Sequence, residues 1–185
     1  MDKYIFKKSG ALPLDECKYF IDLLENCDTL VFDKFRSYLA PNELSFNPKT
    51  YQEYFSKSYD YIKPSLEEYI SLHPFLNNIG SPWDIDSMIN LQKYPIGQHY
   101  KREHCEHGVM PNMRLRILAW MVYLNDIEKG GGTCWPQQNF ISIPKAGDLY
   151  IWPAAWTHSH YGQIAPYEEK YILTGWCKFT DQPKP

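Results

Sequence analysis

Residues 116–124, RILAWMVYL, and residues 170–179, KYILTGWCKF, carry the strongest strand signals in the sequence. Three further apolar runs lie in the same half of the chain, MINLQKY at 88–94, NFISIP at 139–144 and DLYIWP at 148–153. Gly, Pro and Asn separate the five runs at a spacing that is typical of a β-sandwich or barrel. We therefore expect a β core over residues 87–185.

The first half of the chain has the period of helices instead. Apolar residues recur at helical intervals over residues 14–24, where Pro13 and Asp15 suit a first turn. They recur over residues 47–72, which we expect to form two helices that break or kink just before Pro64. A short strand is expected at residues 4–6.

The stretch 73–86 is rich in Pro, Asn and Gly, so we expect a loop there. Long loops are often functional, and residues 71–86 could form a lid over a substrate groove. No repeat, low-complexity tract or flexible linker divides the chain. The sequence thus predicts one domain, 1–185, in which residues 1–86 form a helical support for the core at 87–185.

Charge and composition exclude several functions. The 185 residues include 19 Lys and Arg against 22 Asp and Glu, and they contain no long block of consecutive basic residues. Nucleic-acid binding is therefore not expected. Neither a secretion signal nor an apolar run long enough for a membrane span is found, so we expect a cytoplasmic protein. The five cysteines contain no C-x-x-C and predict neither a disulfide framework nor a zinc ribbon.

Five of the six histidines gather in two clusters, HYKREHCEH at 99–107 and HSH at 158–160. On a strand, His104 and Glu106 point to one face because they are two residues apart, and His107 points away. His158 or His160 can supply a third ligand. Two imidazoles and one carboxylate are typical of non-haem Fe(II) oxygenases. They also suit a zinc hydrolase, although the H-E-x-x-H spacing is missing.

Lys170 stands at the start of an apolar run, ten residues after His160. It is either exposed beside Glu168 and Glu169 or buried, and a buried ammonium requires an anionic partner.

Together these residues resemble the 2-oxoglutarate- and Fe(II)-dependent dioxygenases, specifically the prolyl 4-hydroxylase-like branch. The ordered match covers about residues 91–180, with Glu106 where the family usually has an aspartate. The chain also resembles the short oxygenases of phages and marine bacteria, in segments such as YPIGQHYKREHCE at 94–106. The matching positions are Tyr94 and Gly97, His104-Cys105-Glu106, Arg116 before Tyr123-Leu124-Asn125, Gly130 to Thr133, Pro144 to Gly147, His160-Tyr161-Gly162, Lys170 and Trp176.

The resemblance implies a role for each matching residue. His104, Glu106 and His160 would be the catalytic iron ligands, with His160 preferred to His158 because Gly162 and Lys170 follow at the family's offsets. Lys170 would pair with the distal carboxylate of 2-oxoglutarate. The cosubstrate pocket would also contain Tyr94, Thr133 and Trp176, and the substrate would contact Tyr100, Arg116 and Trp135.

The implied fold is mainly β with N-terminal helices, a double-stranded β-helix (jelly roll) backed by helices. The implied reaction converts 2-oxoglutarate and O2 to succinate and CO2 while hydroxylating a peptidyl proline at its 4-position, with ascorbate as a reductant. Two alternatives stay open: an oxygenase acting on a free amino acid or another small molecule or side chain, and a non-catalytic jelly-roll binding module. For a phage-encoded enzyme the site of action would be the host cytoplasm.

Overall fold

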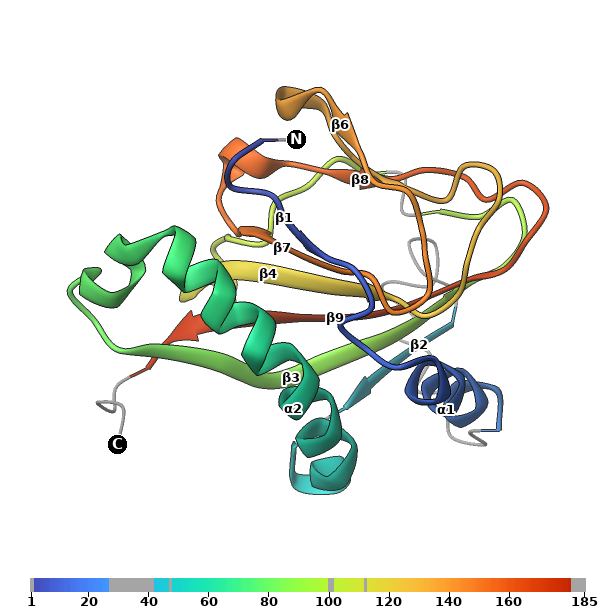
Figure 1. Ribbon diagram of the computed structural model, residues 1–185, viewed down its shortest axis with the longest axis horizontal. Helices are drawn as coiled ribbons and strands as arrows, with labels where there is room; N and C mark the ends of the chain where they lie inside the picture. The colour runs from blue at the N-terminus through green and yellow to red at the C-terminus, as the bar shows by residue number, and fades with distance from the viewer. Residues whose placement is uncertain (1, 27–41, 47, 100–101, 112, 181–185) are drawn as a thin grey trace.

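The computed structural model describes residues 2–26, 42–46, 48–99, 102–111 and 113–180, of which 42–46 and 48–56 are described by their backbone alone. Two α-helices, three short 3-10 helices and nine strands follow one another along this part of the chain (Figure 1). In order they are β1 (Phe6–Lys8), α1 (Leu14–Glu25), β2 (Asn42–Phe46), α2 (Pro48–Leu72), η1 (Pro74–Asn78), β3 (Trp83–Tyr94), β4 (Arg116–Tyr123), β5 (Thr133–Trp135), η2 (Pro136–Gln138), β6 (Phe140–Ile141), β7 (Leu149–Pro153), η3 (Trp156–His158), β8 (Tyr161–Gly162) and β9 (Lys170–Phe179).

The described strands form two antiparallel sheets. The larger has six strands in the order β1-β7-β4-β9-β3-β2, and the smaller has three in the order β6-β5-β8. The expected β core is therefore present, and the runs at 116–124 and 170–179 pair at its centre as β4 and β9. The N-terminal half, expected to be helical apart from residues 4–6, also contributes the edge strands β1 and β2.

Both helices cover one face of the larger sheet (Figure 1). Helix α1 buries Cys17, Phe20 and Leu24 on this face, as its apolar period predicts. The opposite face packs towards the smaller sheet through a second cluster of buried residues, which includes Tyr94, Trp152 and Trp176. The functional residues described below lie on this second face, away from the helices.

The prediction of two separate helices on either side of Pro64 is wrong, because one helix, α2, runs from Pro48 to Leu72. A proline inside a helix costs about 3 kcal/mol. Ile62 before the proline and Leu66 and Tyr69 after it are buried in the same core. Packing on both sides of Pro64 stabilises the continuous helix by more than the proline destabilises it.

The predicted loop at 73–86 is also shorter than expected. It contains η1, and β3 begins at Trp83 and continues to Tyr94. The Trp83 indole donates a hydrogen bond of 2.8 Å to the Leu76 carbonyl, and Leu76 and Ile79 pack on the helix-side core. These contacts hold the segment on the face of the sheet opposite the functional residues.

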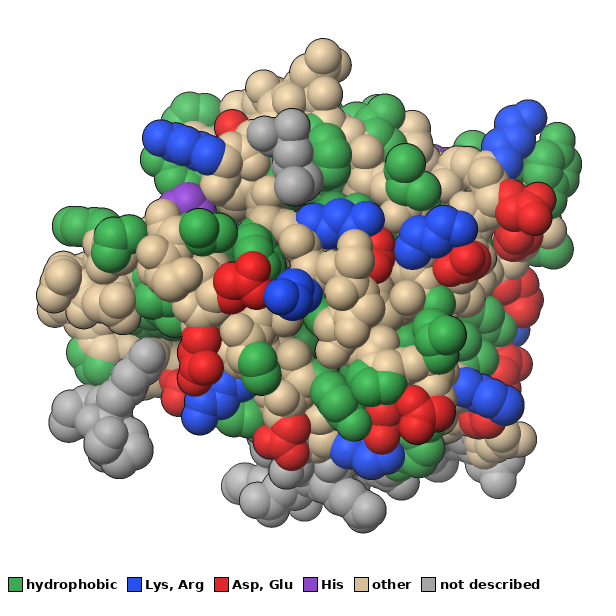
Figure 2. All heavy atoms as spheres, in the orientation of Figure 1, with side chains coloured by type: hydrophobic (Ala, Val, Ile, Leu, Met, Phe, Trp, Pro, Cys, Tyr) green, Lys and Arg blue, Asp and Glu red, His purple; other side chains and the backbone are tan. Residues whose placement is uncertain are grey.

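Side-chain charges are mixed on the face of the molecule shown in Figure 2. In the view of Figure 2, basic and acidic groups alternate without a large patch of one sign, as the near-neutral composition predicts. The four cysteines in the described residues are free thiols. No helix in this part of the chain combines the length and the apolar character that crossing a membrane requires.

Candidate metal and cosubstrate site

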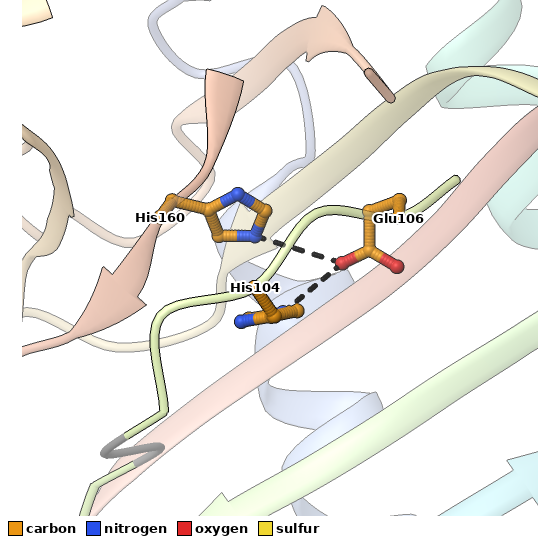
Figure 3. Close-up of side chains that lie close together, drawn as sticks. All are labelled: His104, Glu106 and His160. Carbon is orange, nitrogen blue, oxygen red and sulfur yellow. Dashed lines mark ion pairs between the residues drawn. The ribbon is translucent and has the colours of Figure 1, made fainter. Parts of the chain in front are cut away.

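A short β-bridge brings His104 and His160 side by side. The two residues exchange backbone hydrogen bonds of 3.0 and 2.9 Å, and their ring centroids lie 4.4 Å apart. Two residues later, the Glu106 N–H donates to the Ala154 carbonyl at 3.0 Å. The segment from His104 to Glu106 is thus held against the chain around β7 and β8, although it forms no regular strand. The predicted two-residue spacing still turns both side chains to one point (Figure 3).

Backbone carbonyls fix the orientation of both imidazoles. His104 Nδ1 lies 3.0 Å from the Arg102 oxygen, and His160 Nδ1 lies 3.0 Å from the His158 oxygen. A carbonyl oxygen only accepts hydrogen bonds, so Nδ1 carries a proton in both rings. The other nitrogen, Nε2, is left to face Glu106, which is the arrangement of metal-ligating histidines.

Glu106 completes a cluster of three potential ligands. Its Oε1 lies 3.3 Å from His104 Nε2 and 3.6 Å from His160 Nε2 (Figure 3). One ligand atom from each residue lies within 4.8 Å of the others. Burial raises the pKa of the Glu106 carboxyl, but the two imidazoles lower it more strongly and hold it well below its usual range. The carboxylate therefore stays ionised, the form that binds a metal.

The second Glu106 oxygen has partners of its own. Oε2 accepts hydrogen bonds from Trp176 Nε1 at 2.8 Å and from Arg116 Nη1 at 3.2 Å. The Arg116 guanidinium also stacks on the Trp176 ring, 3.5 Å from its centroid. The resemblance assigns Trp176 to the cosubstrate and Arg116 to the substrate, whereas both side chains contact Glu106 here.

Lys170 is buried on the same face, at 2% exposure. Of the two positions expected for it, exposed beside Glu168 and Glu169 or buried, the structure has the buried one. Its Nζ donates to the Gly131 carbonyl at 3.2 Å and lies 4.6 Å from the centre of the Tyr94 ring. Among the described residues no carboxylate lies within salt-bridge distance of Nζ. Burial lowers the pKa of Lys170 from 10.5 to about 8. The ammonium thus lacks the anionic partner that its burial calls for.

One cavity of about 500 Å³ joins these groups. A volume of this size accommodates a small organic acid together with part of a second molecule. None of residues 71–86, all of which the structure describes, lines the cavity, so the predicted lid is not found. The lining includes the three potential ligands, Lys170, Tyr94, Thr133, Arg116 and Trp176.

The remaining predicted residues lie in different places. The Thr133 hydroxyl is buried at the cavity wall, 3.1 Å from the Tyr123 hydroxyl. Trp135 is fully buried and absent from the cavity lining, because its ring packs on Phe140 and, 5.9 Å away, on His160. Tyr100 lies outside the described residues.

His107 and His158 turn away from the cluster. His107 Nδ1 contacts the Arg116 carbonyl at 3.1 Å, as its odd spacing from His104 predicts. His158 is buried with Nε2 3.7 Å from an Asp2 carboxylate oxygen.

Sequence reasoning missed two polar residues that line the cavity from β3. Asn90 and Gln92 are buried, and the Tyr94 hydroxyl donates to Gln92 Oε1 at 3.0 Å. Asn90 and Gln92 alternate with the apolar residues Ile89 and Leu91 inside MINLQKY. Polar side chains two apart in a buried strand share one face, and this was the available signal.

Comparison with known proteins identifies the family. Residues 89–178 match the 2OG-Fe(II) oxygenase superfamily. A probable prolyl 4-hydroxylase 9 from Arabidopsis thaliana is 24% identical over 120 residues, which are 50% of this chain and 41% of that protein. This chain thus spans about two fifths of the length of that curated relative.

Solved structures show the same fold. A viral collagen prolyl hydroxylase from Paramecium Bursaria Chlorella virus-1 has a TM-score of 0.73 at 20% identity, over 96% of this chain and 97% of that one. A prolyl-4-hydroxylase from Pseudomonas putida has a TM-score of 0.66 at 18% identity, over 95% and 92% of the two chains. The jelly-roll core predicted from the sequence is confirmed by these likenesses.

Residues 89–178, just under half of the chain, thus carry a 2OG-Fe(II) oxygenase domain. Members of this family require Fe(II), 2-oxoglutarate and O2. The match supports an oxygenase, and it supports neither the zinc hydrolase nor the non-catalytic binding module considered from the sequence.

Proposed function

We propose that the chain hydroxylates proline residues in peptides, with Fe(II) held by His104, Glu106 and His160 and with 2-oxoglutarate held by Lys170. The observation that carries this proposal is the joint presence, in one cavity, of three converging ligand atoms and a buried lysine without a carboxylate partner among the described residues. Fe(II) with 2-oxoglutarate and O2 supplies the oxidation that places one oxygen atom on the substrate and leaves succinate and CO2.

The residues present fit these cofactors. The Nδ1 protons of His104 and His160 are held by carbonyls, so both Nε2 atoms are available as ligands without reorientation. Glu106 adds one negative charge, and the three together leave further positions of an octahedral ion open, as non-haem oxygenases need. This set therefore suits Fe(II) better than a closed structural zinc site.

Lys170 fits a dicarboxylic acid. A carboxylate placed against Nζ would compensate the buried ammonium, and the charge-assisted hydrogen bond would be strong in a cavity that excludes water. The Tyr94 ring and the Gly131 carbonyl hold the lysine in place from two sides. Met121 and Ile172 provide apolar walls that keep water from the Lys170 end of the cavity.

The proline assignment rests on the relatives. Proteins named as prolyl hydroxylases appear both among the sequence relatives and among the structures of the same fold. The bound substrate would lie at the open side of the cavity, beside the metal ligands. We therefore propose a proline-containing peptide or protein as the substrate and partner.

The test measures oxygen on the substrate. The protein would be incubated with Fe(II), 2-oxoglutarate, ascorbate and a proline-rich peptide, beside a matched peptide with alanine for every proline and beside free proline. We expect a one-oxygen mass gain on a proline of the first peptide alone. Oxygen on free proline but not on the peptide would overturn the peptide assignment in favour of a small-molecule oxygenase, and oxygen on the alanine peptide would overturn the choice of proline.

A further inference from the structure

The two oxygens of Glu106 have different surroundings. Oε1 faces the two imidazole Nε2 atoms, at 3.3 and 3.6 Å. Oε2 is turned away from them and accepts hydrogen bonds from Trp176 and Arg116. A glutamate has one more rotatable bond than an aspartate and can present either oxygen or both to an ion. The contacts at Oε2 remove that freedom.

A bulge in β4 aims Arg116 at this oxygen. Leu118, Trp120 and Val122 point to the helix-side core, so strict alternation would place Arg116 on the same side. The pairing of β4 with β9 shifts its register between Arg116 and Leu118. Bulges often re-aim a side chain next to an active site. Here the shift turns Arg116 into the cavity, where it is 4% exposed.

Trp176 adds a directional contact from the neighbouring strand. It lies on β9 opposite Ala119 of β4, and the Arg116 guanidinium carbon lies over its ring, 3.5 Å from the centroid. A buried indole N–H needs an acceptor, and Glu106 Oε2 provides it at 2.8 Å. The stack fixes the planar guanidinium, and both donors then reach one oxygen from fixed directions.

We propose that Arg116 and Trp176 are positioning residues that hold the longer carboxylate ligand so that Glu106 binds the metal through Oε1 alone. The inference rests on the proposed function, because it concerns how Glu106 acts toward the metal. It assigns both side chains to the ligand instead of to the cosubstrate or the substrate. Outer contacts of this kind are typically worth 10- to 100-fold in metal affinity.

Co(II) binding tests the proposal without turnover. Trp176→Phe keeps an aromatic ring beneath Arg116 but removes the N–H donor together with the second ring of the indole, so we expect Co(II) affinity to fall about tenfold. Glu106→Asp shortens the carboxylate by one methylene and withdraws it from Trp176. In that background, Trp176→Phe should change Co(II) affinity by less than about twofold, because the hydrogen bond is already lost.

Trp83→Phe is the matched control. It also removes an indole hydrogen bond to an oxygen, 2.8 Å from the Leu76 carbonyl, but on the helix side of the sheet. It should lower the melting temperature and leave Co(II) affinity unchanged. If Trp176→Phe does not fold, Arg116→Met tests the other donor and carries the same expected loss.

Three outcomes would overturn the inference. In the first, Trp176→Phe binds Co(II) as tightly as the wild type. In the second, Trp176→Phe lowers Co(II) affinity by the same factor with and without Glu106→Asp, which would make the role of the indole general packing. The third outcome is distinct: if the wild type binds no Co(II), the proposed metal site fails and the positioning role fails with it.

Discussion

Replacing Lys170 by methionine should stabilise the free protein and remove its affinity for 2-oxoglutarate. Burial lowers the pKa of Lys170 from 10.5 to about 8, so the charged form is disfavoured in the folded protein. That difference corresponds to about 3 kcal/mol of destabilisation at neutral pH. Tyr94 and Gly131 offset part of it through contacts with Nζ, and we expect a gain of about 1–3 kcal/mol for Lys170→Met.

The sign of the effect follows from proton linkage. The unfolded lysine binds its proton up to a pH near 10.5 and the folded one up to about 8. The cost is therefore complete below pH 8, and it disappears as the pH rises from about 8 towards 10.5. The advantage of Lys170→Met should be largest near neutral pH and should shrink over that range.

Thermal melting with and without ligand measures both effects. For a chain of this size, the gain corresponds to a rise of about 3–10 °C in melting temperature. With Co(II) present, 2-oxoglutarate should raise the melting temperature of the wild type and leave that of Lys170→Met unchanged. Two results would refute the reasoning. Lys170→Met could melt well below the wild type at neutral pH, or 2-oxoglutarate could raise its melting temperature by as much as it raises that of the wild type.

Three further predictions concern the same site and its support. In steady-state assays, the Michaelis constant for 2-oxoglutarate should rise as the pH passes about 8, because Lys170 of the free enzyme loses its charge there. A constant that does not change between about pH 7 and about pH 9 would contradict this. His158→Asn should retain Co(II) binding in calorimetric titrations while His160→Ala loses it, because only His160 faces the ligand cluster; the reverse order would move the third ligand to His158. Gly175→Ala should cost about 1–3 kcal/mol in denaturant unfolding, since its Cβ would lie 2.2 Å from Trp120 Cζ2 in the packed core, and an unchanged midpoint would show that the indole can move.

Local patterns predicted the parts of the fold that depend on short-range periodicity. The five apolar runs contain or overlap the strands β3, β4, β6, β7 and β9, and the period at 14–24 gives α1. The break at Pro64 could not be judged from the sequence, because the outcome depends on burial of Ile62 and Leu66 against a distant sheet. Strand β1 begins at Phe6, the last residue of the strand expected at 4–6, whereas the edge strand β2 was not expected and gains its partner only through tertiary pairing.

The candidate site, like the fold, has features that local sequence patterns predicted and features that depend on tertiary structure. The two-residue spacing of His104 and Glu106 is a local feature, and it predicted their convergence even though the segment is not a regular strand. The choice between His158 and His160 needed either the family resemblance or the structure. The contact of Arg116 with Glu106 could not be predicted, because alternation along β4 points Arg116 to the other face and only the bulge redirects it.

The most direct test of the account is succinate release by the purified protein. Fe(II), 2-oxoglutarate and air are supplied to the wild type, His160→Ala and Lys170→Met, with a proline-rich peptide present. We predict iron-dependent succinate from the wild type that both substitutions abolish, because one removes a metal ligand and the other the partner of the cosubstrate. Equal succinate release by the wild type and either variant would contradict the assignment of that residue, and no release from the wild type under any of these conditions would contradict the account as a whole.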